Sequence, residues 1–266
     1  MTKRCRKRKK ASTYKAMETK TLFIDSRTKI AGGTHADFKV SLPEQVTLRG
    51  ARVRVDSIKT TDTIKTVSSR NKYAYFLDGS GGLAHVTLAE GAYTGTTFAA
   101  ELQWQSSRNC LYIQTSNSLQ VAYEAATRII WEDSELEGFP ASSFPPGATP
   151  DNPLSINDIL GSEAVVFGTG ITFSFITMAP LQDLYLCSHR LMVHDSWMPK
   201  GQRNAIAKLS LRGGFGTMVE GKTPDGIFYE LGDHVTLKEL DFQLRDYRGA
   251  LVPLLAPISF QLIFEC

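Results

Sequence analysis

The segment "ARVRVDSIKTT", residues 51–61, alternates between apolar and polar side chains. Val53 and Val55 fall on one side of an extended chain, whereas Arg52 and Arg54 fall on the other. A period of two residues is typical of a β-strand with one face buried and one face in water. This segment therefore predicts a strand at the surface of a packed sheet.

The same strand-like composition recurs along most of the chain, in segments such as "TLFIDS", "ADFKVSL", "KYAYFLD", "CLYIQTS", "AIAKLSL", "HVTLKELDFQLRD" and "ISFQLIFEC". We count about ten strands and two short helices, without the βαβα alternation of a parallel sheet. The prediction is an all-β fold: a single jelly-roll β-sandwich with one or two short helices and a basic N-terminal arm. The expected division is an arm at 1–20 and one jelly-roll domain at 21–266.

Two helices and one long connection interrupt the strands. "TGTTFAAELQWQ" begins with threonines that can cap a helix, and "LSINDILG" is predicted as a short helix that ends at Gly161. Between these segments, five of the 11 prolines fall from Pro140 to Pro153. Proline removes donors from a sheet, so this stretch is expected to be a surface connection.

The net charge of +3 conceals a strong asymmetry. Residues 1–20 hold nine Lys or Arg against one Glu, a balance of +8, which leaves −5 on the rest. Such an arm seeks polyanions or an acidic partner, and its two readings are nucleic-acid binding and a nuclear targeting patch. The residues expected to make these contacts are Lys3, Arg4, Arg6, Lys7, Arg8, Lys9 and Lys10. No apolar run is long enough to span a membrane.

A phosphate-loop pattern, G-x-x-x-x-G-K-[ST], occurs at 216–223 as "GTMVEGKT". Such a loop binds phosphate only where a strand precedes it and a helix follows it. Here Pro224 follows directly, and then the strand-like "IFYEL". The prediction is a glycine-rich loop at one end of the sandwich, and a nucleotide hydrolase remains the weakest alternative.

Other catalytic or metal-binding patterns are not recognisable in the sequence. The five histidines form no HExxH or HxH pattern, and none of the four cysteines sits in a C-x-x-C pair. The acidic run Glu132, Asp133, Glu135 and Glu137 is interpreted as a solvated turn or as a partner for a neighbour's basic patch. We expect that the protein is not an enzyme and that it has no catalytic, cofactor-binding or metal-binding residues.

Several pieces of the chain, in their order, resemble a known family. They are "LFIDSRTKIAGGTHADFKVSLPE", "HVTLAEGAYTGTTFAAELQ", "LSINDILG", "DLYLCSHRL", "LKELDFQLRDYRGALVPL" and "ISFQLIFE". Together they resemble the minor capsid (penton) proteins of Polinton/Maverick elements, virophages and their relatives, over about residues 21–266. That family consists of single jelly-roll proteins without catalytic residues.

The resemblance implies a structural role in a virion. Five subunits would form a homo-pentamer at each vertex of an icosahedral shell, next to a major capsid protein built from double jelly-roll capsomers. The arm would point inward, toward genomic DNA or internal cement proteins. The expected location is the capsid vertex of the virion, with the host nucleus as an assembly site. Two alternatives stay open: a single jelly-roll major capsid protein that forms a whole small shell, and a lectin-like or receptor-binding β-sandwich.

Overall fold

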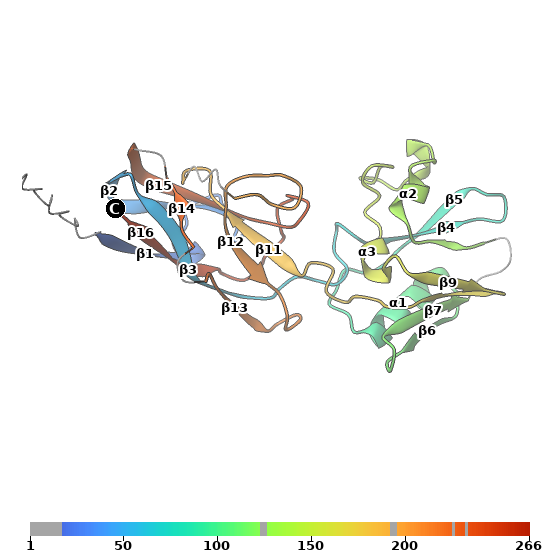
Figure 1. Ribbon diagram of the computed structural model, residues 1–266. Helices are drawn as coiled ribbons and strands as arrows, with labels where there is room; N and C mark the ends of the chain where they lie inside the picture. Colours follow the sequence, from blue (N-terminus) through green and yellow to red (C-terminus); the bar gives the residue numbers. More distant parts are fainter. Residues whose placement is uncertain (1–17, 123–126, 192–195, 225–226, 232–233) are drawn as a thin grey trace, which may run out of the picture.

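The chain folds into two lobes joined by a narrower connection (Figure 1). The jelly-roll lobe comprises residues up to 62 together with 181–266, and the inserted lobe comprises 63–180. This computed structural model describes residues 18–122, 127–191, 196–224, 227–231 and 234–266.

Eight jelly-roll strands and the short β14 form the two antiparallel sheets of the jelly-roll lobe. One sheet has the order β1-β16-β3-β13, with the short β14 also paired to β3, and the other has the order β12-β11-β15-β2. Counted within the lobe, these orders are first-eighth-third-sixth and fifth-fourth-seventh-second, the double Greek key of a jelly roll. The strands are β1 (Thr19–Asp25), β2 (Asp37–Arg49), β3 (Arg52–Thr61), β11 (Asp183–Cys187), β12 (Ala205–Ser210), β13 (Met218–Lys222), β14 (Tyr229–Glu230), β15 (His234–Arg245) and β16 (Ser259–Glu265). The predicted all-β jelly-roll class is confirmed.

Alternation along the strands places the core of this lobe between its two sheets. In β16 the residues Phe260, Leu262 and Phe264 are buried, and the residues between them are partly exposed. Phe242 of β15 packs edge-on against Phe260, with ring centroids 4.8 Å apart. Val53 and Val55 are fully buried, as the opening segment predicts.

β2 continues past the point where its sequence suggests an end. It runs through Pro43, which is compatible with a strand because β2 lies at the edge of its sheet. The register with β15 shifts between Leu237 and Glu239, so the extra residues around Pro43 form a bulge.

The inserted lobe has its own sheets and its own core. Its core consists of buried residues between Val67 and Ile176, separate from the core of the jelly-roll lobe. Its sheets have the orders β5-β4-β8 and β6-β7-β10-β9. The elements are β4 (Tyr73–Leu77), β5 (Leu83–Thr87), α1 (Gly95–Ser106), β6 (Cys110–Ile113), β7 (Ser118–Ala122), β8 (Ile129–Ile130), α2 (Asp133–Leu136), α3 (Asn157–Leu160), β9 (Ala164–Phe167) and β10 (Gly170–Phe173), with a 3-10 turn at Ala141–Ser143. The other 3-10 turn, Ser26–Thr28, follows β1 in the jelly-roll lobe.

This lobe is an insertion between the third and fourth strands of the jelly roll. The sequence predicts one jelly roll over 21–266, whereas the eight jelly-roll strands come only from the residues on either side of 63–180. Strands of both lobes have the same period of two residues, so alternation does not indicate where one packed unit ends and another begins.

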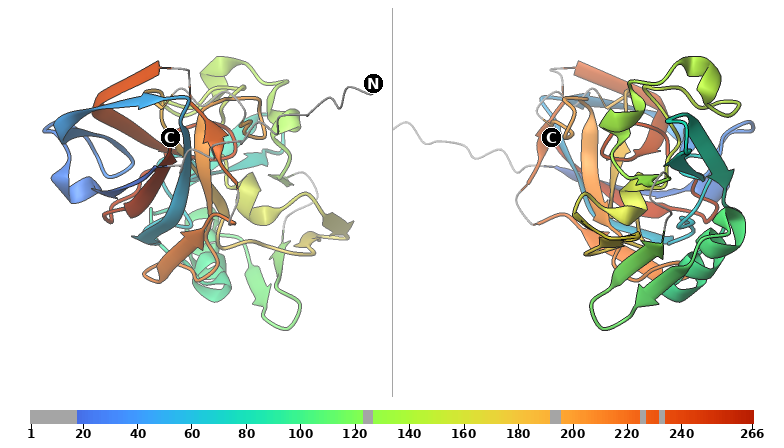
Figure 2. Two further views of the ribbon diagram at one scale, coloured as in Figure 1. Left: turned by 60° about the vertical axis from the view of Figure 1, so that its left-hand side comes forward. Right: turned by 90° about the vertical axis from the view of Figure 1, so that its right-hand side faces the viewer.

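Local signals correctly locate α1 and α3, whereas α2 falls in the acidic run that the sequence analysis interpreted as a turn. Thr94 caps α1: its side chain accepts from the Thr97 backbone N–H, and the Thr97 hydroxyl accepts from the Thr94 backbone N–H. α3 ends at Gly161, whose φ of 74° lies in the region that favours glycine. Figure 2 looks onto the inserted lobe in its right-hand view, where α1 lies beside the hairpin of β6 and β7.

Candidate functional site

The phosphate-loop pattern at 216–223 is not a phosphate loop. Residues Met218–Lys222 form β13 and pair with β3, with Gly221 opposite Ile58. A Cβ at Gly221 would lie 2.9 Å from Leu209 Cδ1 and 3.0 Å from Ile58 Cγ2, so these side chains pack closely over the glycine. The described residues after Lys222 reach β14 without a helix. The predicted loop is therefore wrong at 218–222, which is a strand, while the sequence-based rejection of a nucleotide site agrees with this geometry.

The described histidines have separate surroundings. His35 Nδ1 lies 2.8 Å from Ser26 Oγ, and burial lowers the pKa of His35. The ring of His85 meets Tyr73 edge-on, and His189 Nδ1 lies 3.3 Å from Asn204 Nδ2. Among the residues that the structure describes, no three His, Cys, Asp or Glu side chains group as metal ligands. His194 and Cys5 lie outside the described residues.

The acidic run at 132–137 falls on α2, and two of its four carboxylates have internal partners. Asp133 Oδ1 accepts from Ser155 Oγ at 2.6 Å and from Asn157 Nδ2 at 2.8 Å, which ties α2 to the segment before α3. Glu135 forms an ion pair with Arg128. Glu132 and Glu137 are exposed. Asp133 thus stabilises the end of the proline-rich connection, while Glu132 and Glu137 face solvent.

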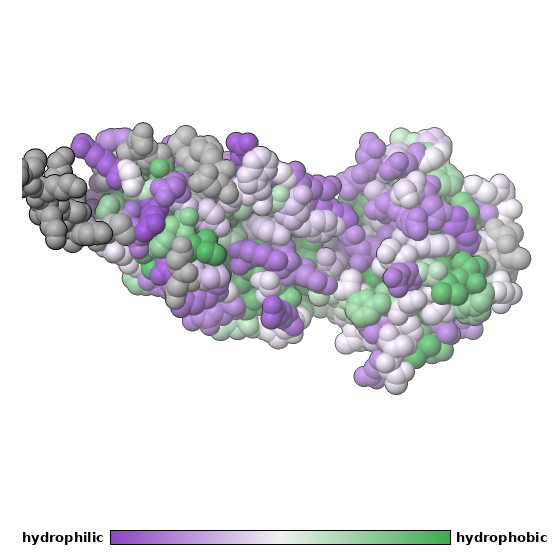
Figure 3. Space-filling view, viewed as in Figure 1, coloured by the Kyte–Doolittle hydropathy of each residue, from purple (hydrophilic) through white to green (hydrophobic). Residues whose placement is uncertain are grey.

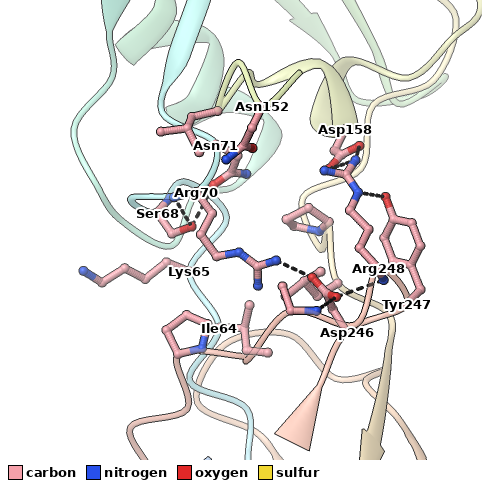
Figure 4. A pocket seen from close by; sticks show the side chains of 15 residues that line it. Ile64, Lys65, Ser68, Arg70, Asn71, Asn152, Asp158, Asp246, Tyr247 and Arg248 are labelled. Atoms are coloured by element: carbon pink, nitrogen blue, oxygen red, sulfur yellow. Dashed lines mark hydrogen bonds and ion pairs between the residues drawn. The ribbon is translucent and has the colours of Figure 1, made fainter. Parts of the chain in front are cut away.

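The hollow with the densest charge lies where the two lobes meet (Figure 4). It has a volume of about 220 Å³. Its walls come from the two linkers between the lobes, at 64–71 and 180–181, from the segment 152–158 of the inserted lobe, and from the connection between β15 and β16. The residues that line this hollow therefore belong to the contact between the lobes.

Two arginine–aspartate pairs cross this junction. Arg70 of the first linker donates to the carboxylate of Asp246, whose side chain is almost fully buried. Asp246 Oδ1 also accepts from the backbone N–H groups of Arg248 and Ala250, each at 2.9 Å. Arg248 donates to both carboxylate oxygens of Asp158 in the inserted lobe, at 2.7 and 2.9 Å. We call these four side chains the interlobe clamp.

Burial sets the electrostatics of the clamp. It raises the pKa of Asp158, and the nearby Arg248 opposes that shift only in part, while Asp133 adds to it. Burial likewise raises the pKa of Tyr247, whose hydroxyl accepts from Arg248 Nε at 2.7 Å. Each carboxylate of the clamp is paired with an arginine across the junction. We therefore describe the hollow as the contact region that joins the two lobes.

The basic arm lies outside the described residues, and this applies to Lys3, Arg4, Arg6, Lys7, Arg8, Lys9 and Lys10 alike. Its point of attachment is described: β1 begins at Thr19, two residues before the predicted domain start, and Thr19 pairs with Glu265 at the other end of the chain. This end of the jelly-roll lobe is the pole that faces away from the inserted lobe (Figure 1).

Charge is distributed unevenly between the parts of the molecule. Residues 63–180 hold five Lys or Arg and 11 Asp or Glu, a balance of −6. The jelly-roll residues 21–62 and 181–266 hold 16 basic and 15 acidic residues, a balance of +1. The +8 of residues 1–20 is therefore attached at one pole, and the −6 of the inserted lobe lies at the other.

Proteins similar to this chain are found among solved structures. No family model matches the chain, and no curated protein matches it. Among solved structures, the chain is similar to the mavirus penton protein, at 8% sequence identity and a TM-score of 0.47. The match covers 93% of this chain and 99% of that one. The resemblance found in the sequence and this match name the same kind of protein, a penton protein. No helix in the described part of the chain is long and apolar enough to cross a membrane.

Proposed function

We propose that the chain is a structural subunit of a viral capsid, of the penton type. The observation that carries the proposal is the combination of a jelly-roll lobe with opposite charges at its two ends. A basic arm is attached at the pole of β1 and β16, and an acidic lobe is inserted at the other pole. Such a subunit has one end suited to a polyanion and another that a polyanion repels.

In this proposal, five copies close into a ring at the vertex of an icosahedral shell. Head-to-tail contacts close whenever the rotation between neighbours divides the circle evenly. The neighbours of the ring are capsomers of a double jelly-roll major capsid protein, and the protein is located in the virion. The nuclear alternative stays a prediction from the sequence of the arm.

The arm contacts genomic DNA or an internal cement protein in this arrangement. Each Lys or Arg that meets a phosphate releases counterions, so DNA binding by the arm weakens steeply with salt. A truncation that tests this should remove residues 1–17 and keep Thr19, because β1 already pairs with β16 there.

Electron microscopy of the purified full chain tests the proposal. Five-fold rings support it. Closed shells from this chain alone favour the whole-shell major capsid protein, and monomers that bind a sugar favour the lectin-like alternative. Either of those results overturns the penton assignment. The truncated chain should keep its melting temperature and lose DNA or shell association, and unfolding of the truncated chain would show that the arm belongs to the core.

A further inference from the structure

One sheet of the inserted lobe has two unlike ends. In the order β6-β7-β10-β9, the strands β6 and β9 are the two edges. β9 presents three consecutive apolar side chains to solvent: Val165, Val166 and Phe167 are 59, 56 and 49% exposed. Figure 3 shows apolar side chains gathered on the inserted lobe in the region of β7 and β9. An edge strand with such side chains is a contact site, because its unpaired backbone and its apolar surface both favour a partner.

The opposite end of the same sheet is hollowed. A hollow of about 880 Å³ lies between α1 and β6. Its floor is formed by small side chains of α1, namely Thr96, Ala99 and Ala100. Trp104 and Leu111, which also line it, are 80 and 59% exposed. The helix therefore leaves room for an apolar segment from outside, beside an uncovered tryptophan.

The two ends are complementary in shape and in charge. A strand with three protruding apolar side chains stands at one edge. The hollow at the other edge, where the exposed Trp104 and Leu111 lie among polar side chains, is about 14 Å away for four strands spaced ~4.8 Å apart. Glu163, exposed, directly precedes β9, and Arg108 lines the hollow with its guanidinium over the ring of Phe76. A carboxylate beside the incoming strand would thus approach a cation.

We propose that β9 of one copy docks into the hollow between α1 and β6 of the next copy. This inference rests on the proposed function as a ring-forming subunit, and it names the surface by which neighbours meet. A projection and a hollow at opposite edges of one sheet are different surfaces, so their contact is head-to-tail and leads to a ring when the rotation closes. Side-by-side pairing of two β9 strands would instead give a two-fold dimer.

The charge of the inserted lobe predicts an unusual salt dependence for this contact. Neighbouring lobes of −6 repel one another, and salt screens that repulsion. The lobe contact should therefore strengthen as salt rises, whereas binding of the arm to DNA should weaken. The lobe contact and the binding of the arm to DNA can therefore be distinguished, because salt strengthens one and weakens the other.

Two variants of the full chain test the contact by complementation. Val166→Glu places a charge on β9 and leaves the hollow intact, and Ala100→Glu blocks the hollow and leaves β9 intact. Each variant alone should lose rings in sedimentation and electron microscopy, with association weakened at least about tenfold, equivalent to ~1.4 kcal/mol. Mixed in equal amounts, they should form dimers and nothing larger, since one intact strand and one intact hollow remain per pair.

The controls separate this contact from the proposed function. Thr87→Glu changes an exposed position on β5 of the same lobe and should form rings like the native chain. Formation of the mixed dimer also shows that both variants are folded. If either variant does not fold, Val166→Cys and Ala100→Cys on separate chains should form a disulfide-linked dimer on oxidation.

The outcomes are distinct. Native-like rings of Val166→Glu overturn the β9 contact and leave the penton assignment standing. Dimers of Ala100→Glu alone, lost in Val166→Glu, show two-fold pairing of β9 and overturn the head-to-tail contact. A native chain that remains monomeric at all concentrations and salts overturns both.

Discussion

Arg70 donates a hydrogen bond to Asp246, although the two residues lie 176 positions apart and belong to different parts of the molecule. Arg70 lies on the linker that enters the inserted lobe, and Asp246 lies directly after β15 of the jelly roll. The jelly-roll lobe therefore contacts the insertion through its own connection between β15 and β16. The Arg70–Asp246 pair is therefore a direct contact between the two lobes.

Replacing Asp246 with Ala should weaken this contact. The variant removes the acceptor of Arg70 and of two backbone N–H groups at a buried position. Because Arg70 is partly exposed, we expect a loss of about 1–3 kcal/mol in unfolding free energy, the usual range for an unsatisfied buried partner. Urea unfolding measures it. Asp183→Ala is the matched control, because its pair with Lys208 is exposed and worth about 0–1 kcal/mol. Equal losses in both variants would contradict the role of the clamp.

Asp158 should make stability depend on pH in the direction opposite to an ordinary ion pair. Burial raises its pKa in the folded state, so the folded protein favours the protonated carboxyl. The protonated form of Asp158 stabilises the folded state. This contribution is fully present below the pKa of the unfolded state, near 4, and is lost as the pH rises through the raised pKa of the folded state. Relative to Asp158→Asn, the native chain should therefore lose stability between about pH 4 and neutral pH.

Urea unfolding of both chains from pH 3 to 7 measures this difference. The groups that face Asp158 and contribute to the shift are Arg248, Asp133 and Arg70, and they are the same in both chains. Parallel pH profiles of the two chains would contradict the assignment.

Loss of the α1 cap should destabilise the inserted lobe. Thr94→Ala removes the acceptor for the Thr97 N–H at the first turn, at an expected cost of about 1 kcal/mol. Thr96→Ala is the control, because Thr96 is exposed and makes no part of the capping box. Thermal unfolding followed by circular dichroism compares the two, and an unchanged melting temperature in Thr94→Ala would mean that tertiary packing alone fixes the start of α1.

The jelly-roll lobe should fold without residues 63–180. All eight of its strands and its core come from outside that range. A chain in which a Gly/Ser linker replaces 63–180 should unfold in one cooperative transition, and its tryptophan fluorescence should report Trp197 alone. A molten state without cooperative unfolding would show that the lobes depend on each other.

Nucleotides should not stabilise the protein through the segment 216–223. The backbone of Met218–Lys222 pairs with β3, so its N–H groups do not form a cradle for phosphates. Magnesium with ATP or GTP should leave the melting temperature of the native chain and of Lys222→Ala unchanged. A rise in the native chain that Lys222→Ala abolishes would restore the hydrolase alternative.

The sequence predicts local structure better than it predicts the arrangement of the lobes. Alternation locates the strands, and Thr94 and Gly161 locate the ends of two helices, because these signals act over a few residues. The insertion, β13 within a glycine-rich stretch, and the interlobe clamp all depend on contacts between distant residues. Arg70 and Asp246 carry no local pattern that marks them as partners, and Gly221 in β13 looks like a loop glycine until its neighbours are seen.

The pairing of β1 with β16 has a consequence for synthesis on the ribosome. Thr19 finds its partner only when Glu265, far later in the sequence, has been made. The inserted lobe is complete long before that, so it should fold first while β1, β2 and β3 still lack the strands they pair with. Pairings at such sequence separation are slow to form and leave apolar strands exposed in the meantime. Overproduction of this chain should therefore benefit from low temperature or from chaperones that bind extended apolar segments.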